Sequence, residues 1–313
     1  MTGLSVARRP SEVSVTEVAA KHALNRVRGM GFRWSLNPYQ GCAHQCVFCY
    51  ARSTHAYREL DGVREWGSRI VAKVNLARAL RADLARPSWR NESIAIGTAT
   101  DPYQSHEGRY RLMRGVLAAL RDARCPFHII TRSPLIVRDL DLLVACARRA
   151  EVGVAVSIAT LDAALARRIE PTVAAPQQRL RAVAALAAAG IRVGVAVAPI
   201  LPDLTDEPAS LARVVRAAAD AGAHNVWHST LHLGEVTRDA YFAFLDQARP
   251  DLVERYRRIY RNGKYAEGAY VGLISARMRA ARTGVRFAPH RPPPRDPSGE
   301  QLDLLHARVS GRE

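Results

Sequence analysis

Short apolar runs alternate with stretches of helical pattern along most of this chain, and no other feature limits its fold as strongly. Val-Gly-Val-Ala-Val occurs twice, at 152–156 and 193–197, each time between two helical stretches. A run that is apolar throughout is typical of a strand buried on both faces, as in a parallel sheet covered by helices. About six strand–helix units follow one another, which predicts an α/β fold with a partial or full barrel.

The predicted strands span 32–36, 70–74, 93–97, 127–131, 152–158, 191–198 and 225–231. The predicted helices span 76–86, 109–124, 138–149, 207–221, a stretch from 237, and a segment from 161 to 190 that Pro171 interrupts. Asp206 is the expected N-cap of the helix at 207–221. Gly190 is the glycine expected to end the helical segment before it.

The two ends of the chain differ in character from this alternating region, 32–249. Residues 1–31 are polar and weakly patterned, which predicts an irregular arm. Residues 250–286 keep a helical pattern without a further strand, and we expect a helical appendage on the barrel. From 287 to 313 five prolines lie close together, which indicates a disordered tail.

Three of the five cysteines, Cys42, Cys46 and Cys49, share one short stretch with the spacing C-x3-C-x2-C. Three thiolates on a short loop indicate a metal site in a chain with too few cysteines for a disulfide framework. Three ligands suit an iron–sulfur cluster in which one iron has no protein ligand. A structural zinc site needs a fourth ligand, for which His44 is the nearby candidate. Three unrelated thiols are the remaining alternative.

The composition bears on partners and on the compartment. Forty-six basic residues against 29 acidic ones give a net charge of +17, which favours a polyanionic partner over a neutral solvated surface. Cys125 and Cys146 lie in apolar surroundings and are expected to be buried free thiols. This use of cysteine is typical of the reducing cytoplasm. We expect neither a signal peptide nor a membrane span, because no apolar run is long enough.

With Phe48 before its last cysteine, the motif C-x3-C-x-aromatic-C resembles the signature of the radical S-adenosylmethionine (SAM) superfamily. Within it, residues 32–233 are similar to the spore photoproduct lyase branch, also called DNA repair photolyase-like. That likeness rests on the cysteine loop and on four runs, at 100–104 (Thr-Asp-Pro-Tyr-Gln), 130–133 (Ile-Thr-Arg-Ser), 168–171 (Arg-Ile-Glu-Pro) and 198–202 (Ala-Pro-Ile-Leu-Pro). The resemblance implies a (β/α)6 partial barrel of the TIM type.

The same resemblance implies two cofactors, a [4Fe–4S] cluster on the three cysteines and SAM on its open iron. Reductive cleavage of SAM would give a 5′-deoxyadenosyl radical, with electrons from a donor such as flavodoxin or ferredoxin. Phe48 then packs near the adenine of SAM, and Arg132 and Ser157 match SAM-facing positions of the lyase. The resulting cofactor-binding set is Phe48, Thr98, Thr100, Arg132 and Ser157, and the catalytic set is Tyr50, Asp101 and His232. For each of these side chains, a solvated or capping role is the alternative.

One departure from the lyase concerns the hydrogen donor. The lyase uses a cysteine to return hydrogen to a substrate radical, and Thr98 occupies the matching position here. A threonine O–H bond is too strong to donate that hydrogen. Reversal of a thymine dimer by the lyase mechanism is therefore not expected, and another lesion, a modified nucleobase or a protein substrate stays open.

His224, His228 and His232 are spaced by four in and beside the predicted last strand. Residues an even number apart share a face of a strand, so all three are able to point into the barrel. A metal triad and satisfied histidines are the two interpretations. His232 lies nearest the carboxyl end of the strand and is the one that we place in the site.

Residues 301–305 of the tail, Gln-Leu-Asp-Leu-Leu, resemble the short peptide with which bacterial repair proteins bind the sliding clamp, with Leu305 in place of the usual Phe. A disordered tail with apolar anchors suits such a motif. We predict a cytoplasmic radical SAM enzyme that acts on nucleic acid, with DNA favoured, in repair or modification. The alternatives are a radical SAM enzyme on a peptide or small molecule, and a non-enzymatic nucleic-acid-binding protein with a structural metal.

Overall fold

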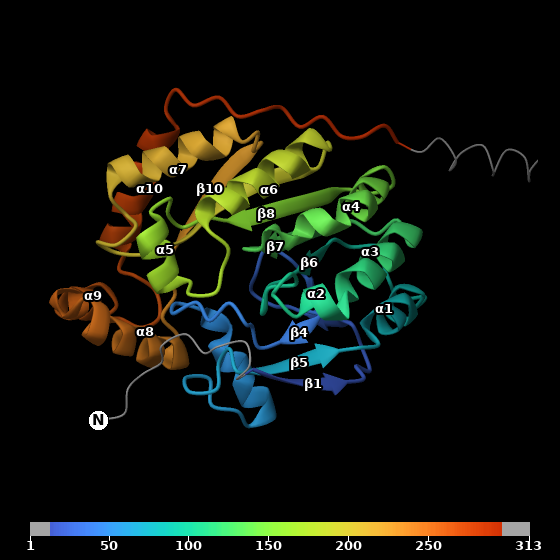
Figure 1. Cartoon of the computed structure of the whole chain (residues 1–313), viewed down its shortest axis with the longest axis horizontal. Helices are drawn as coiled ribbons and strands as arrows, with labels where there is room; N and C mark the ends of the chain where they lie inside the picture. Colours follow the sequence, from blue (N-terminus) through green and yellow to red (C-terminus); the bar gives the residue numbers. More distant parts are fainter. Residues whose placement is uncertain (1–12, 296–313) are drawn as a thin grey trace, which may run out of the picture.

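The computed structural model describes residues 13–295, and its centre is a sheet of mostly parallel strands (Figure 1). Within these residues the strand order is β10-β9-β8-β7-β6-β3-β2. Neighbouring strands from β3 to β10 pair in parallel, whereas β2 runs antiparallel to β3. The strands are β2 (Leu24–Arg26), β3 (Trp34–Leu36), β6 (Ile94–Ile96), β7 (Phe127–Thr131), β8 (Val152–Ser157), β9 (Arg192–Ile200) and β10 (Asn225–Thr230).

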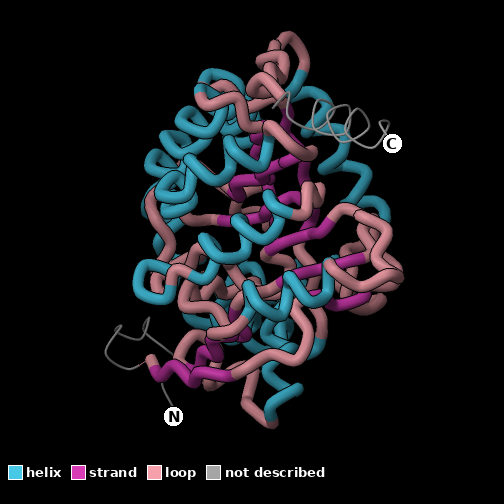
Figure 2. Tube along the Cα trace, turned by 90° about the vertical axis from the view of Figure 1, so that its right-hand side faces the viewer, coloured by secondary structure: helices cyan, strands magenta, loops and turns pink. Residues whose placement is uncertain are grey.

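This sheet is an open, partial barrel. β2 and β10 form its two edges, and no closed barrel is found among the described residues. Figure 2 shows the strands stepping through the middle of the molecule with helices outside them. The repeated apolar runs lie in the neighbouring strands β8 and β9, both mostly buried. The prediction of an α/β partial barrel is therefore confirmed.

A second, three-stranded sheet lies beside the first, with the order β1-β5-β4. It contains β1 (Ser14–Val18), β4 (Tyr39–Gln40) and β5 (Arg69–Lys73). The strand predicted at 70–74 thus exists, but it pairs with β1 and β4 and contributes no strand to the barrel.

Residues 14–26 form two strands, although the sequence predicts only an irregular arm there. Asn75 accepts a hydrogen bond from Ala20 N at 2.7 Å and donates one to Ala20 O at 2.9 Å. Asp83 Oδ2 accepts from Ala23 N at 2.7 Å and from Leu24 N at 3.1 Å. The partners that order this segment come from distant parts of the chain, so no local pattern announces them.

The helices lie between the strands and after the last of them. The α-helices are α1 (Leu76–Leu84), α2 (Glu107–Tyr110), α3 (Leu112–Asp122), α4 (Leu140–Ala147), α5 (Ala163–Ile169), α6 (Pro176–Ala188), α7 (Pro208–Asp220), α8 (Glu235–Ala248), α9 (Val253–Ile259) and α10 (Gly268–Arg282). The 3-10 helices are η2 (Tyr50–Arg58), η3 (Pro134–Asp139) and η4 (Pro250–Leu252).

Two details of the predicted helices are wrong. The helix predicted at 109–124 breaks at Arg111, whose φ is +51°, because the buried Glu107 accepts from Leu112 N and Met113 N, at 3.1 and 3.0 Å, and caps α3. Asp206 does not cap α7. Glu207 caps it instead. Asp206 Oδ2 accepts from Tyr270 at 3.0 Å.

The segment from η4 to α10 packs on the barrel. α10 lies against α7 and β10. Three buried tyrosines of the segment from η4 to α10 donate hydrogen bonds to the loops that follow β9 and β10. Tyr256 donates to Pro202 O and Tyr260 to Leu231 O, each at 2.9 Å, while Tyr270 donates to Asp206. These bonds fix the appendage beside the carboxyl ends of β9 and β10.

After α10 the chain turns back along the molecule. His290 Nε2 lies 3.2 Å from the carbonyl oxygen of Gly190. Gly190 follows α6 with a φ of +76°, and the helix ends there as predicted. The start of the predicted tail therefore contacts the amino-terminal edge of the sheet. Residues 301–305 lie outside the described residues. Among the described helices, none combines the length and apolar character needed to cross a membrane.

Candidate active site

The three motif cysteines lie on a loop between β4 and η2, here called the cysteine loop, residues 41–50. β4 therefore intervenes between the predicted strand at 32–36 and the motif. Gly41 opens the loop with a φ of +77°, and a Cβ there would lie 2.4 Å from Arg69 O. Only glycine fits so close to the neighbouring backbone.

Side chains from three distant segments hold the backbone of the cysteine loop. Gln104 Oε1 accepts from Ala43 N at 2.8 Å, and Thr172 Oγ1 donates to Ala43 O at 2.5 Å. Thr237 Oγ1 donates to Cys49 O at 3.2 Å. These partners follow β6 and α5 or lie in the first turn of α8, so distant segments of the fold fix the position of the loop.

One pocket at the carboxyl edge of the sheet contains every side chain that the sequence places in the site. The predicted residues that line it are Cys42, Cys46, Phe48, Cys49, Tyr50, Thr98, Thr100, Asp101, Arg132, Ser157 and His232. They come from the cysteine loop and from the ends of β6, β7, β8 and β10. Their convergence is what a parallel sheet produces at this edge.

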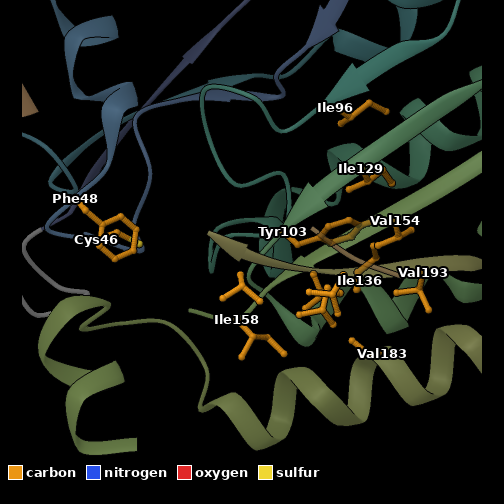
Figure 3. Close-up of a cluster of buried hydrophobic side chains, with 14 of the residues drawn as sticks. Cys46, Phe48, Ile96, Tyr103, Ile129, Ile136, Val154, Ile158, Val183 and Val193 are labelled. Atoms are coloured by element: carbon orange, nitrogen blue, oxygen red, sulfur yellow. The ribbon is translucent and has the colours of Figure 1, made fainter. Parts of the chain in front are cut away.

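The three thiols are suited to binding a cationic group. Cys42 and Cys46 are buried, and burial raises the pKa of Cys42 to about 12. Burial likewise raises the pKa of Cys46 and of Cys49. In Figure 3, Cys46 and Phe48 lie next to each other on the loop, apart from the other labelled side chains of the buried cluster. Buried thiolates need a positive partner, which iron supplies when it displaces the protons.

The same residues do not fit a single zinc ion. Among the described residues, no three His, Cys, Asp or Glu side chains are close enough to hold one metal ion. His44, the fourth zinc ligand considered above, has Nε2 3.1 Å from Asp101 Oδ2. Each iron of a [4Fe–4S] cluster takes its own thiolate, so the three ligands stand farther apart than ligands of one ion. Three thiols that line one pocket supply three such ligands and leave the fourth iron open, so the donor set suits the cluster.

Asp101 is buried at the end of the loop after β6. Its carboxylate accepts from Thr131 Oγ1 and from Arg132 N, both at 2.7 Å, and from Tyr103 N at 2.9 Å. Burial raises the pKa of Asp101, but the charge and hydrogen bond of His44, with these donors, outweigh burial and leave the pKa below its usual range. Asp101 thus stays ionised and joins β7 to the cysteine loop.

Arg132 extends from the end of β7 into the pocket. Its guanidinium carbon lies 5.2 Å from the centre of the Phe48 ring, and Nη2 donates to Ala198 O at 3.2 Å. Nη1 lies 3.1 Å from Glu170 Oε1. The guanidinium is therefore held over the ring of the aromatic residue predicted to face adenine.

Glu170 joins Arg132 to a second arginine. Arg179 Nη2 donates to Glu170 Oε2 at 2.7 Å, and both side chains are 1% exposed. Arg179 Nη1 also donates to the carbonyl oxygen of Ser157, at 2.9 Å. One carboxylate thus serves two guanidinium groups, and it fixes the end of β8 relative to the pocket.

The hydroxyl groups after β6 are mostly used in holding loops together. Thr100 Oγ1 donates to Gly41 O at 2.6 Å, so this side chain braces the cysteine loop. Thr98 Oγ1 accepts from Asn37 Nδ2 at 3.3 Å, and Thr98 O accepts from the Tyr50 hydroxyl. Tyr50 itself is 47% exposed.

The three histidines do not meet. His232 lines the pocket, where its ring lies 6.3 Å from Tyr50 and 4.9 Å from Tyr265. His224 Nδ1 bonds to Val193 O at 2.6 Å, at the opposite edge of the sheet. No metal triad forms among the described residues. The interpretation of satisfied histidines therefore holds for His224. Burial and the Lys264 charge lower the pKa of His232, which favours its neutral form.

With this geometry in place, comparison with known proteins is decisive. Residues 36–215 match the sequence model of the family described as "Radical SAM superfamily". The chain belongs to this superfamily. It is an enzyme of the radical SAM class, a family whose members use a [4Fe–4S] cluster and SAM.

The radical SAM protein has relatives in bacteria, archaea and viruses. It is 41% identical to "Uncharacterized protein Rv2578c" of Mycobacterium tuberculosis over 90% of this chain and 84% of the relative. Identity to "Uncharacterized protein MJ0683" of Methanocaldococcus jannaschii is 29%, over 63% of this chain and 71% of that one. Identity to "Uncharacterized protein ORF301" of Acidianus two-tailed virus is 32%, over 64% and 67%.

Among solved structures, the fold is similar to spore photoproduct lyase, as the sequence resemblance implied. A variant of that lyase with bound AdoMet and dinucleoside spore photoproduct gives a TM-score of 0.68 at 13% identity, over 91% of this chain and 85% of the lyase. The lyase complexed with dinucleoside spore photoproduct gives 0.66 at 14% identity, over the same shares. At these identities the likeness concerns the fold.

Two groups of residues, one in the pocket of this radical SAM protein and one behind it, escape the sequence analysis. Trp227 and Ser229 of β10 line the pocket and are exposed, whereas Val226 is buried and His228 is half-buried. This alternation along the predicted strand was the available signal. Arg179 of α6 does not line the pocket but holds Glu170 behind it, and no pattern in the sequence pairs the two side chains.

Proposed function

We propose that this radical SAM enzyme holds a [4Fe–4S] cluster on Cys42, Cys46 and Cys49, binds SAM in the adjoining pocket, and acts on nucleic acid, with DNA favoured. The observation that carries the proposal is the convergence of the three motif thiols, Phe48 and Arg132 on one pocket. When bound, the cluster and SAM together supply a 5′-deoxyadenosyl radical.

The residues of the chain would hold, orient and shield these cofactors. Phe48 and the Arg132 guanidinium give a flat wall and a cationic donor group for a ligand with an aromatic base and a carboxylate. Ser157, Thr98 and Thr100 lie around the same space and are the remaining cofactor-binding candidates. Cys42 and Cys46 are buried, and a bound cofactor and substrate would shield a reactive radical from water.

The mouth of the pocket supports a nucleic-acid substrate. We call Tyr50, His232, Lys264 and Tyr265 the pocket lip. Their rings follow one another from Tyr50 through His232 to Tyr265, and Lys264 Nζ lies 5.4 Å from the centre of the Tyr265 ring. Tyr265 is 67% exposed. Exposed aromatic rings beside a cation are suited to stacking an unpaired base near the phosphate backbone.

The pocket also limits the reaction. Cys125 and Cys146 do not line it, and Cys146 Sγ lies 3.4 Å from Leu117 O in the core. Thr98 stands at the position where the lyase has its donor cysteine. We therefore favour a different lesion or a base modification over dimer reversal through a cysteine. Tyr50 and His232 present a phenol and an imidazole to the pocket and are the catalytic candidates. The Asp101 carboxylate already accepts hydrogen bonds from Tyr103 N, Thr131 Oγ1 and Arg132 N, so we assign it to positioning Arg132.

Anaerobic incubation of reduced protein with SAM and with labelled DNA tests this function. We expect SAM cleavage together with exchange of label between SAM and a nucleobase. Exchange into an added peptide, with none into DNA or RNA, would favour the alternative radical SAM enzyme on a peptide. Stoichiometric zinc without sulfide in anaerobically purified protein would favour the non-enzymatic nucleic-acid-binding alternative.

We further propose that residues 301–305 bind a sliding clamp and keep the enzyme near copied DNA by tethering. The described chain supports this arrangement, because His290 contacts Gly190 at the edge of the sheet opposite the pocket. A peptide spanning 296–309 should bind purified clamp with micromolar affinity, of the order typical of short peptides. Gln301→Ala with Leu304→Ala should abolish binding, and a peptide without affinity would refute the tether.

A further inference from the structure

A second hollow lies on the other side of the cysteine loop from the pocket. Residues of this stretch divide between the two sides. Cys46 and Phe48 line the pocket, whereas Gln45, Val47 and Arg52 line the hollow. The backbone of one loop therefore separates the thiols from the hollow. The other residues that line the hollow are Val63, Arg64, Trp66, Arg168, Pro171, Ala240, Ala243, Phe244 and Gln247.

Arg52 connects the floor of this hollow directly to the loop. Its guanidinium donates to Cys46 O at 3.1 Å and to Gly62 O at 3.2 Å, and it lies 5.7 Å from the centre of the Trp66 ring. The side chain is 7% exposed, and its Nε has no hydrogen-bond partner. A fixed positive charge thus stands between the hollow and the backbone that carries the thiols.

The hollow is apolar at its floor and basic around it. Val47, Trp66 and Phe244 supply apolar surface, and Arg64 and Arg168 supply positive charge. No acidic side chain is among the described residues that line it. Arg64 is 84% exposed and lies 3.9 Å from Asp61, and Arg168 donates to Ala248 O at 3.0 Å. Aromatic and arginine side chains together are typical of the energetic centre of a protein interface.

Electrons need an entry path other than the pocket. If SAM and substrate fill the pocket during turnover, a protein donor has no access to the thiols from that side. We propose that the hollow is the docking site of the electron donor, a small acidic one-electron carrier of the flavodoxin or ferredoxin class. This inference rests on the proposed function. The donor loses one electron and the cluster gains it, with no bond formed between the two proteins.

Charge reversal at the rim tests the docking site. The double variant Arg64→Glu/Arg168→Glu should bind purified flavodoxin at least about tenfold more weakly than the unmodified enzyme, because like charges now face each other. The matched control is Arg81→Glu/Arg90→Glu, which makes the same charge change on the exposed surface near α1. Calorimetry at two salt concentrations should show that added salt weakens binding to the unmodified enzyme and to the control.

Activity separates this proposal from the proposed function. With dithionite as reductant, the rim variant should cleave SAM as fast as the unmodified enzyme, and with flavodoxin it should be slow. Unchanged flavodoxin affinity in the rim variant, or equal loss in the control, would overturn the docking site. If the rim variant lost affinity for DNA and kept its affinity for flavodoxin, the docking site would also be overturned, and the hollow would be a nucleic-acid-binding surface instead. An unmodified enzyme that binds flavodoxin but cleaves no SAM with dithionite would refute the proposed function, while the binding results still decide the docking site.

Discussion

Replacing Glu170 by glutamine should destabilise the protein strongly, because one buried carboxylate serves two arginines. Glu170 Oε2 accepts from Arg179 at 2.7 Å, its Oε1 lies 3.1 Å from Arg132, and both Glu170 and Arg179 are 1% exposed. Removing one partner of a buried pair leaves an uncompensated charge and costs about 3–5 kcal/mol. We expect the midpoint of thermal unfolding to fall by roughly 5–8 °C.

The pH dependence of stability should change in the same variant. Burial raises the pKa of Glu170, but the charges of Arg179 and Arg132 outweigh it and hold the folded pKa below the ordinary value. A group with a depressed folded pKa stabilises the fold above its unfolded pKa and loses that contribution as pH falls through the folded pKa. The difference in unfolding free energy between the two proteins should therefore be largest near neutral pH and shrink in acid.

The matched control is Glu151→Gln. Glu151 also pairs with an arginine, Arg192, at 2.9 Å, but the side chains are 74% and 46% exposed. An exposed pair contributes at most about 1 kcal/mol. Urea unfolding of both apo-proteins measures the two losses directly. A loss for Glu170→Gln that is no larger than the loss for Glu151→Gln would refute the reasoning about the buried network.

Two further predictions concern ligands. Arg132→Ala and Ser157→Ala should each weaken SAM binding while the iron and sulfide content stays unchanged; unchanged affinity in both, measured by calorimetry on reconstituted protein, would remove them from the SAM site. Tyr265→Ala should weaken binding of single-stranded DNA by about 1–3 kcal/mol, roughly 5- to 150-fold, because one stacking surface is lost. Tyr57→Ala, at an 85% exposed tyrosine that does not line the pocket, should leave affinity unchanged, and equal effects of the two changes in fluorescence anisotropy would rule out the pocket lip.

The sequence was informative wherever a residue's role follows from its neighbours. Strands β8 and β9 are apolar throughout because helices cover the outer face of the sheet, and this shows in any short window. The side chains after β6 and β7, such as Asp101 and Arg132, were found because parallel strands deliver their carboxyl ends to one edge. The cysteine spacing made the loop itself unmistakable.

Features that depend on distant partners were not predictable. β1 and β2 are ordered by Asn75 and Asp83, which lie in or beside α1. The break before α3 follows from Glu107, whose carboxylate turns back onto the first amides of that helix.

The hollow behind the cysteine loop likewise depends on distant segments. It exists because α8 packs beside η2, far along the chain. Contacts of this kind form only in the assembled fold, so the sequence pattern of one segment does not predict them.

The most direct test of the central claim is chemical analysis of iron and sulfide in anaerobically reconstituted protein, with Cys42→Ala, Cys46→Ala and Cys49→Ala combined as the control. We predict four irons and four sulfides for each chain, as a [4Fe–4S] cluster requires, with SAM cleavage upon reduction, and the loss of all three in the triple variant. Zinc without sulfide in the unmodified protein, or an intact cluster in the triple variant, would contradict the account.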